Sequence, residues 1–501
     1  MNVHRRFDQS SHTVIIGAGM AGTAAAVTLS AVGEAVTLIE GNAYPGGKMR
    51  QLPSPVGPID SGPTVFTMKY VFEELFDKAG CNFDDLVDHQ KAEILARHAW
   101  DSEGTFDLFA SREGSAERIR EFFDGENAKG YLKFCNDAKT IYETLKSTYI
   151  GAQCPGPFEL AQRIGLNKPK SLWALKPFDT LWSALGKYFP DKRLQQLFGR
   201  YATYIGSSPF QAPATLMLIA HVEQEGVWMI EGGMHQLAKA MQSLAIAKGT
   251  DVRNNTNAAF ITVENGAITG VVTDEEEFIA ADRIIYCGDI SALAKLIPNN
   301  RKVAPPVPYL KRSISAVTFS MEAECSGLPL HRHNVFFSSD YEREFSTIFK
   351  HAKIPDNPTV YLCAQDRNDD PKAFNGQSER LLCLINAPAF GDRHTLSQEE
   401  LETCQANMMK TMQTCGLKVN PISNQITQPS DFNHLFPGSG GALYGRASHG
   451  WMASFARPGA RSKIPGLYLA GGSVHPGAGV PMATRSGMLA AEQLMKDRVL
   501  T

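Results

Sequence analysis

A glycine-rich turn between two apolar segments near the N-terminus constrains the fold of this chain more than any other feature. Residues 13–16 are β-branched and predict a buried strand, and Gly17, Gly19 and Gly22 follow them with the spacing GxGxxG. Gly17 permits a tight turn, Gly19 lets a pyrophosphate approach the backbone, and Gly22 lets a helix pack closely on the strand. We expect phosphate groups at the helix N-terminus, where unpaired N–H groups and the helix dipole favour an anion.

An acidic residue at the right distance supports a dinucleotide site. Glu40 lies 18 residues after Gly22 and directly follows a second predicted strand, residues 35–39. A carboxylate there accepts hydrogen bonds from ribose hydroxyls, and its charge opposes a ribose 2′-phosphate and therefore NADP. The chain is thus predicted to be an α/β protein with a Rossmann-like dinucleotide-binding domain.

Composition excludes several other classes of protein. The 501 residues suffice for two or three domains, and a net charge of −3 without a basic stripe argues against a nucleic-acid partner. Nine scattered cysteines form no CxxC pair, so we expect a reducing compartment and no metal site. Residues 1–11 are polar, which predicts no signal peptide, and residues 14–36 are better explained as strand plus helix than as a membrane span.

Two further glycine-rich segments indicate which dinucleotide binds. In the first, Gly46 and Gly47 precede Lys48 and Arg50, so the backbone and a positive charge can meet a pyrophosphate or a flavin edge. The second lies near the C-terminus. There a predicted strand, a glycine-rich loop and a helix from Pro481 to Asp497 follow one another. The alternative is an ordinary strand–turn–helix that closes the Rossmann-like domain without a ligand contact. Glycine-rich segments at opposite ends of the chain instead indicate a common ligand, and this favours a flavin dinucleotide.

Together these motifs resemble those of the bacterial carotenoid desaturases related to phytoene desaturase. The segments 62–64 (Gly-Pro-Thr) and 232–234 (Gly-Gly-Met) add to the resemblance. The blocks 197–204, 437–446 and 450–455 are similar to one branch, the hydroxyneurosporene (1-hydroxycarotenoid 3,4-) desaturases. The likeness covers essentially the whole chain.

The resemblance implies a division into three parts. Residues 1–70, 226–300 and 430–501 are expected to form a discontinuous FAD-binding domain. Residues 71–225 are expected to be a helical, membrane-associating substrate domain, and residues 301–429 an α+β part with an open antiparallel sheet.

Motif matches and the resemblance together assign the FAD-binding residues. Gly472 takes the place of an acidic residue found in many related flavoproteins, so a backbone contact must replace that carboxylate. The expected FAD-binding residues are Gly17, Gly19, Met20, Ala21, Gly22, Glu40, Gly46, Gly47, Lys48, Arg50, Gly62, Pro63, Thr64, Val252, Gly471, Gly472, Gly479, Val480, Pro481 and Met482.

The reaction that the resemblance implies is desaturation of an acyclic carotenoid. A hydride leaves an allylic CH₂, a proton follows, and a C=C bond forms at C3–C4 of a chain hydroxylated at C1. The partners are the carotenoid, a membrane surface, and a quinone or oxygen as electron acceptor. The expected location is cytoplasmic, peripherally associated with the inner or photosynthetic membrane. Alternatives are a phytoene or other carotene desaturase, a carotenoid cis–trans isomerase, and a non-enzymatic prenyl-lipid-binding protein.

Two candidate catalytic residues each have a structural alternative. His475 lies in the C-terminal glycine loop, where it transfers a proton or orders the loop by a hydrogen bond. Glu231 directly precedes the turn at Gly232 and is either a site acid or a helix-start carboxylate. The pair His331 and His333 has no nearby Cys or acid and is expected in a surface loop.

One aromatic stripe predicts either core packing or a substrate entrance. Its members share one face of a predicted helix: Phe178, Leu181, Trp182, Leu185, Tyr188 and Phe189. Because a carotenoid is collected from lipid, the resemblance gives weight to a membrane-facing role.

Overall fold

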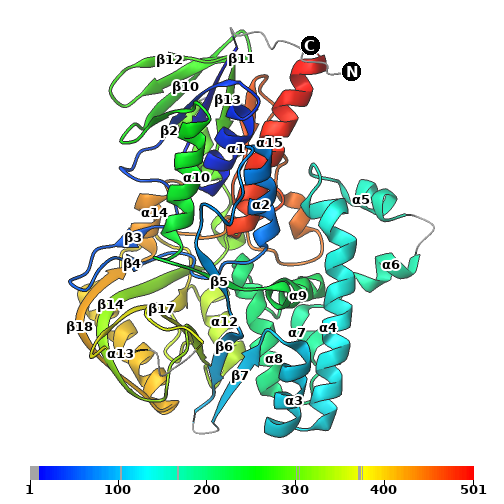
Figure 1. Ribbon diagram of the computed structural model, residues 1–501, viewed down its shortest axis with the longest axis vertical. Helices are drawn as coiled ribbons and strands as arrows, with labels where there is room; N and C mark the ends of the chain where they lie inside the picture. The colour runs from blue at the N-terminus through cyan, green and yellow to red at the C-terminus, as the bar shows by residue number, and fades with distance from the viewer. Residues whose placement is uncertain are drawn as a thin grey trace.

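The computed structural model describes residues 11–101, 104–165, 169–298, 300, 302–303, 305–369, 374 and 376–500 (Figure 1). The prediction about a signal peptide depends on residues 1–11, of which 1–10 lie outside the described residues. None of the described helices combines the length and the apolar character needed to cross a bilayer.

A five-stranded parallel sheet lies at the end of the molecule that carries both termini (Figure 1). Its order is β19 (Leu467–Leu469), β13 (Arg283–Tyr286), β1 (His12–Ile16), β2 (Ala35–Ile39) and β9 (Asp251–Arg253). The strands are short and rich in β-branched and aliphatic residues, as expected of a sheet covered on both faces. The predicted strands at 13–16 and 35–39 are confirmed, and the sheet joins segments from both ends of the chain. The domain limits remain a prediction.

Four helices pack around this sheet: α1 (Met20–Ser30), α2 (Lys69–Lys78), α10 (His235–Ala247) and α15 (Val480–Leu500). In Figure 1 α1 lies between α10 and α15. All residues of α1 are buried, and a Cβ on Gly487 of α15 would lie 2.0 Å from the Ala21 carbonyl oxygen. The two ends of the chain therefore pack backbone to backbone. The predicted C-terminal helix is confirmed.

A small antiparallel sheet flanks the five-stranded one, with β10 (Ala258–Glu264), β11 (Ala267–Thr273) and β12 (Phe278–Ala280). Asn265 and Gly266 connect β10 and β11 with φ of 49° and 82°. Two positive φ angles are the signature of the hairpin turn predicted there. Short helices η4 (Ile290–Ala292) and α11 (Leu293–Leu296) follow.

The second large sheet has seven strands. Its order is β18 (Leu417–Thr427), β14 (Ser315–Gly327), β17 (Glu379–Ala387), β16 (Val360–Ala364), β15 (His333–Phe336), β6 (Ile94–Ala99) and β7 (Thr105–Phe109). All neighbours are antiparallel except β15 and β6. The helices of this part are η5 (Tyr309–Lys311), α12 (Tyr341–Phe349), α13 (Gln398–Thr414) and α14 (Pro429–Leu435). The short helix η6 (Ala453–Ala456) lies against the helical part, where Phe455 packs on its core.

One sequence expectation for this part is incomplete and one is wrong. Residues 71–225 are mostly helical, as expected, but they also contribute β6 and β7, which pair with each other and with β15. His331 and His333 are each only 4% exposed rather than on a surface loop, and His333 begins β15.

The helical part contains α3 (Arg112–Phe122), α4 (Gly125–Leu145), η1 (Lys146–Ile150), α5 (Pro157–Ile164), α6 (Pro169–Ala174), α7 (Leu181–Leu185), α8 (Lys192–Gly199), η2 (Arg200–Ile205), η3 (Ala214–Met217) and α9 (Leu218–Glu225). Side chains of Asp124, Thr180 and Asp191 cap the N-termini of α4, α7 and α8. A core rich in aromatic residues joins these helices to β6, β7 and α12.

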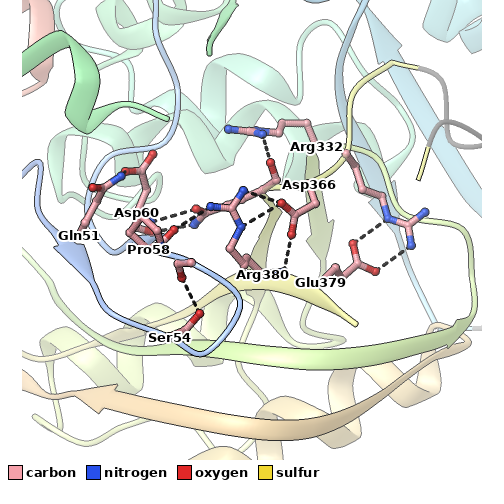
Figure 2. Close-up of polar contacts among 11 residues, drawn as sticks. Gln51, Ser54, Pro58, Asp60, Arg332, Asp366, Glu379 and Arg380 are labelled. Atoms are coloured by element: carbon pink, nitrogen blue, oxygen red, sulfur yellow. Dashed lines mark hydrogen bonds and ion pairs between the residues drawn. The ribbon is translucent and has the colours of Figure 1, made fainter. Parts of the chain in front are cut away.

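A polar cluster joins the loop and hairpin after the second glycine segment to the seven-stranded sheet (Figure 2). The hairpin β3 (Gln51–Leu52) and β4 (Ile59–Asp60) packs against β17, and the pair β5 (His89–Lys91) and β8 (Trp228–Ile230) lies nearby. Arg380 of β17 donates to the Pro58 carbonyl oxygen at 2.8 Å and pairs with Asp366. Asp60 accepts a hydrogen bond from the Met234 N–H at 2.5 Å, so it also fixes the turn before α10.

Candidate functional site

The site begins where β1 ends. Gly17 has a φ of 100°, and a Cβ on Gly22 would lie 1.8 Å from the Gly17 carbonyl oxygen. A side chain at Gly22 therefore cannot be accommodated without moving the turn. Gly19 is the N-cap of α1, no side chain caps this helix, and its first turn holds no acid. The backbone N–H groups at this helix end are suited to an anion.

The second glycine segment lies against the first. The Gly46 N–H donates to the Ala18 carbonyl oxygen at 2.9 Å, and Gly19 and Gly46 form an isolated parallel bridge. The Glu40 carboxylate accepts from the Ala18 N–H at 2.7 Å and from the Asn42 side chain at 2.7 Å. The acid predicted to bind ribose thus lies at the turn that follows β1.

The C-terminal glycine segment reaches the same edge from the other side of β1. The Gly471 N–H donates to the Ser486 hydroxyl at 3.1 Å, and the Gly472 carbonyl oxygen accepts from Arg457 at 2.7 Å. The backbone of Gly472 is thus held by Arg457. The helix α15 begins at Val480, with Pro481 in its first turn.

A large cavity of about 730 Å³ extends from these loops between the seven-stranded sheet and the helical part. Its walls are mainly aliphatic and aromatic. The predicted residues that line it are Lys48, Gly62, Pro63, Thr64, Gly479, Val480, Pro481 and Met482. Others lie outside the lining, in the glycine turns, the first turn of α1 and the strands or strand ends: Gly17, Gly19, Met20, Ala21, Gly22, Glu40, Gly46, Gly47, Val252, Gly471 and Gly472. Val252 lies on β9 beside Leu38.

Three cationic side chains line this cavity. Lys48 donates to the Leu443 carbonyl oxygen at 2.5 Å, and Arg457 donates to the carbonyl oxygens of Gly472, Tyr444 and Arg446 at 2.7, 3.1 and 3.1 Å. Burial lowers the pKa of both Lys48 and Arg457. These two cations hold the backbone of the C-terminal loops, and the third is Arg200.

A chain of hydrogen bonds runs through the inner wall. Thr64 and Tyr361 are joined at 2.6 Å between their hydroxyl oxygens, and Tyr361 contacts His333 Nδ1 at 2.8 Å. Burial lowers the pKa of His333 to about 3 and raises the pKa of Tyr361. His333 is therefore neutral at physiological pH.

Sequence reasoning missed Arg200, Arg457 and Tyr361. Each is a single residue without a motif, and only tertiary packing brings it to the cavity. For Arg200 one signal existed, since it lies inside the block 197–204 that carried the family resemblance.

The two candidate catalytic residues lie elsewhere. His475 is buried, and its Nε2 contacts the carbonyl oxygens of Tyr149 and Ala152 at 3.0 and 2.9 Å. It is not part of the cavity lining and orders the loop. Glu231 is exposed and lines a separate polar cavity of about 550 Å³ beside the cluster of Figure 2. His475 therefore has the contacts of its structural alternative. Glu231 has the position of neither alternative, because the N-cap of α10 is Met234 and no side chain caps this helix.

Arg50 contacts other protein groups. Its guanidinium donates to the Thr427 hydroxyl at 2.8 Å and lies over the Phe432 ring. It ties the loop after the second glycine segment to β18.

The aromatic stripe proved to be mainly core. The helix α7 covers only Leu181–Leu185, and Leu181, Leu185, Tyr188 and Phe189 are buried. Phe178 differs, since it is 69% exposed and packs edge-on against Trp173 and Trp451. These three aromatic residues also line the cavity, so they mark where it reaches the surface.

This fold and this arrangement of turns define a flavoprotein. The family model for flavin-containing amine oxidoreductases matches residues 20–495. The chain belongs to this family, and its cofactor is FAD. The structure fits such a dinucleotide, because the uncapped α1 N-terminus and the Glu40 carboxylate meet at one edge of the sheet.

Individual relatives cover nearly the whole chain. A hydroxyneurosporene desaturase of Rubrivivax gelatinosus is 47% identical over 97% of this chain and 94% of the relative. A hydroxyneurosporene desaturase of Cereibacter sphaeroides is 39% identical over 97% of both chains. Among solved structures, a putrescine oxidase bound to putrescine matches 98% of this chain and 99% of its own with a TM-score of 0.60. At 13% identity this last match shows the fold alone.

Proposed function

We propose that this protein is an FAD-dependent desaturase of an acyclic carotenoid, and that it forms the C3–C4 double bond of a chain hydroxylated at C1. The observation that carries the proposal is the large, mainly apolar cavity that begins at the flavin-side loops. The near full-length similarity to enzymes named hydroxyneurosporene desaturase supports the same substrate class.

The FAD-binding roles follow from the position of each segment. The α1 N-terminus with Gly17, Gly19, Met20, Ala21 and Gly22 binds the pyrophosphate, and Glu40 binds the adenosine ribose. The backbone of Val252 contacts the adenine side. Gly46, Gly47 and Lys48, with residues 62–64, 471–472 and 479–482, surround the flavin end. Their support is the convergence of these segments at one sheet edge and one cavity wall.

The substrate offers no polar group at the reacting carbons, so the cavity acts by binding and orientation. When bound, FAD supplies the two-electron acceptor for the hydride that leaves the allylic CH₂. A proton leaves the neighbouring carbon, and the remaining electron pair forms the C=C bond. Leucine, isoleucine and aromatic side chains of the cavity hold the polyene and exclude water around it. A quinone or oxygen would be the final acceptor of the two electrons.

The entrance to the cavity suits a lipid surface. Exposed aromatic residues gather on and around its rim: Phe158, Trp173, Phe178 and Trp451. Such residues insert into the interface between headgroups and acyl chains, where a carotenoid is available. We therefore place the protein in the cytoplasm, peripherally bound to the inner or photosynthetic membrane.

The test is turnover by purified, FAD-loaded protein in liposomes that contain either a 1-hydroxylated acyclic carotene or the parent carotene. Desaturation lengthens the chromophore, so the absorption maximum moves to longer wavelength and the product mass falls by two hydrogen atoms. An unchanged mass with a changed isomer pattern would instead identify a cis–trans isomerase. A bound carotenoid that stays unaltered in the presence of a quinone or oxygen would identify a carrier of prenyl lipids.

A further inference from the structure

Arg200 differs from the other two cations of the cavity wall. It is the first residue of η2, and its side chain lines the apolar cavity. Its only hydrogen bond among described residues goes from Nη1 to the Tyr204 hydroxyl at 3.3 Å. Its guanidinium also lies 5.2 Å from the ring centroids of both Tyr204 and Tyr361. A guanidinium carries five N–H donors, so most of them remain unpaired.

Arg200 forms no direct ion pair with a described acid. Within the described part of the chain, no carboxylate lies within ion-pair distance of it. The acid in its electrostatic environment is Glu223, which is 6% exposed and accepts a hydrogen bond from the Tyr201 hydroxyl at 2.6 Å, with the Tyr204 hydroxyl nearby. Burial raises the pKa of Glu223, while these hydroxyls and the Arg200 charge lower it. The Glu223 carboxylate thus accepts from a tyrosine hydroxyl and not from Arg200. N–H groups of the Arg200 guanidinium remain for another acceptor.

A second, small cavity next to Arg200 holds too little water to satisfy all of these donors. The small cavity on the other side of Arg200 has a volume of about 10 Å³, which is room for about one water molecule. One water accepts at most two hydrogen bonds, so donors remain on the side of the large cavity. Filling that cavity with a plain hydrocarbon would leave buried charged donors without a partner, which is costly.

We propose that Arg200 binds the oxygen atom of the substrate, and so selects an oxygenated acyclic chain over a plain hydrocarbon. The inference rests on the proposed function. Arg200 faces Tyr361, whose hydroxyl bonds Thr64 in the 62–64 turn that we place at the flavin. In a chain hydroxylated at C1, one carbon atom separates C1 from C3, so the oxygen must lie close to the reacting bond. A donor near the flavin end meets this requirement.

The experiment compares kcat/KM for the 1-hydroxylated acyclic carotene with kcat/KM for the parent carotene, both in liposomes. Wild-type holoenzyme is expected to favour the hydroxylated chain by about 10- to 100-fold. Arg200→Leu should bring the ratio close to one, by losing turnover of the hydroxylated chain only. Arg200→Lys keeps a charged donor and should retain an intermediate ratio. If Arg200 acted only in packing, its substitution would lower kcat/KM for both carotenes by the same factor.

The control is Arg118→Leu on α3, which removes an exposed arginine outside the cavity lining and should leave the ratio unchanged. FAD content and melting temperature are measured for every variant. If the wild-type enzyme converts both carotenes equally well, the proposed role of Arg200 is overturned. The same conclusion follows if FAD-loaded Arg200→Leu keeps the wild-type ratio of the two kcat/KM values. If wild type desaturates neither carotene, the proposed function itself has failed.

Discussion

The cofactor side and the substrate side of the cavity are built in different ways. On the cofactor side, backbone groups and glycine turns at the ends of β1, β2 and β19 form the proposed FAD site. On the substrate side, single side chains from η2, β16 and the helical part line an apolar space. Backbone sites depend on local spacing, while side-chain sites depend on packing. The two sides should therefore respond differently to mutation.

The largest effect is expected from Gly22→Ala. The new Cβ would lie 1.8 Å from the Gly17 carbonyl oxygen, so the turn must move away from the α1 N-terminus. We expect a loss of about 3 kcal/mol or more in unfolding free energy, and purified protein without FAD. Flavin absorbance and thermal unfolding measure both. Gly125→Ala is the matched control, because no heavy atom lies within 4 Å of its added Cβ. A yellow, stable Gly22→Ala protein would contradict the backbone account.

Arg457→Gln tests the boundary between the two sides. The variant removes a buried guanidinium that binds three carbonyl oxygens, so those oxygens lose their donor. We expect a loss of about 2–3 kcal/mol in stability and weaker FAD binding. Calorimetry and FAD titration measure these effects, and Arg461→Gln, an exposed arginine paired with Asp497, is the control. Equal effects of the two substitutions would show that the Gly472 loop does not depend on Arg457.

A smaller effect is expected from the pH dependence of His475. Burial lowers its pKa from 6.5 to about 4, so the unfolded chain binds this proton more readily than the folded one. Stability from this group is complete above pH 6.5 and falls as the pH falls toward 4, by about 1.5 kcal/mol between pH 6.5 and 5. His475→Gln should remove this contribution, so that the melting temperature falls less between pH 6.5 and 5 than in wild type. The variant should retain turnover. Loss of turnover with FAD still bound would restore a proton-transfer role.

The smallest effect concerns the entrance. Phe178→Ser should weaken binding to lipid vesicles by about 1 kcal/mol, or about 5-fold, without changing the melting temperature. Phe278→Ser is the matched control, because Phe278 is 54% exposed but lies on β12, in the small sheet beside the FAD-side sheet. Vesicle flotation measures both. If both variants lost the same amount of vesicle binding, the cavity entrance would not be the membrane-binding surface.

The sequence predicted the FAD-side secondary structure well because its signals are local. The GxGxxG spacing, Glu40 and the Asn265–Gly266 turn each specify backbone geometry within a few residues, and the observed strands and turn agree with them. The helical expectation for residues 71–225 missed β6 and β7, because these strands are stabilised by pairing with each other and with the distant β15.

By itself the sequence determined the parallel sheet and the dinucleotide site, since both depend on glycine spacing and strand patterns along the chain. It determined the family through motifs and longer blocks that resemble those of known desaturases. Only the tertiary structure decided which side chains face the cavity. It turned His475 and Glu231 away and brought in Arg200, Arg457 and Tyr361 from separate segments. The physical reason is that a turn is specified by neighbouring residues, whereas a buried side chain acquires its surroundings only when distant segments pack.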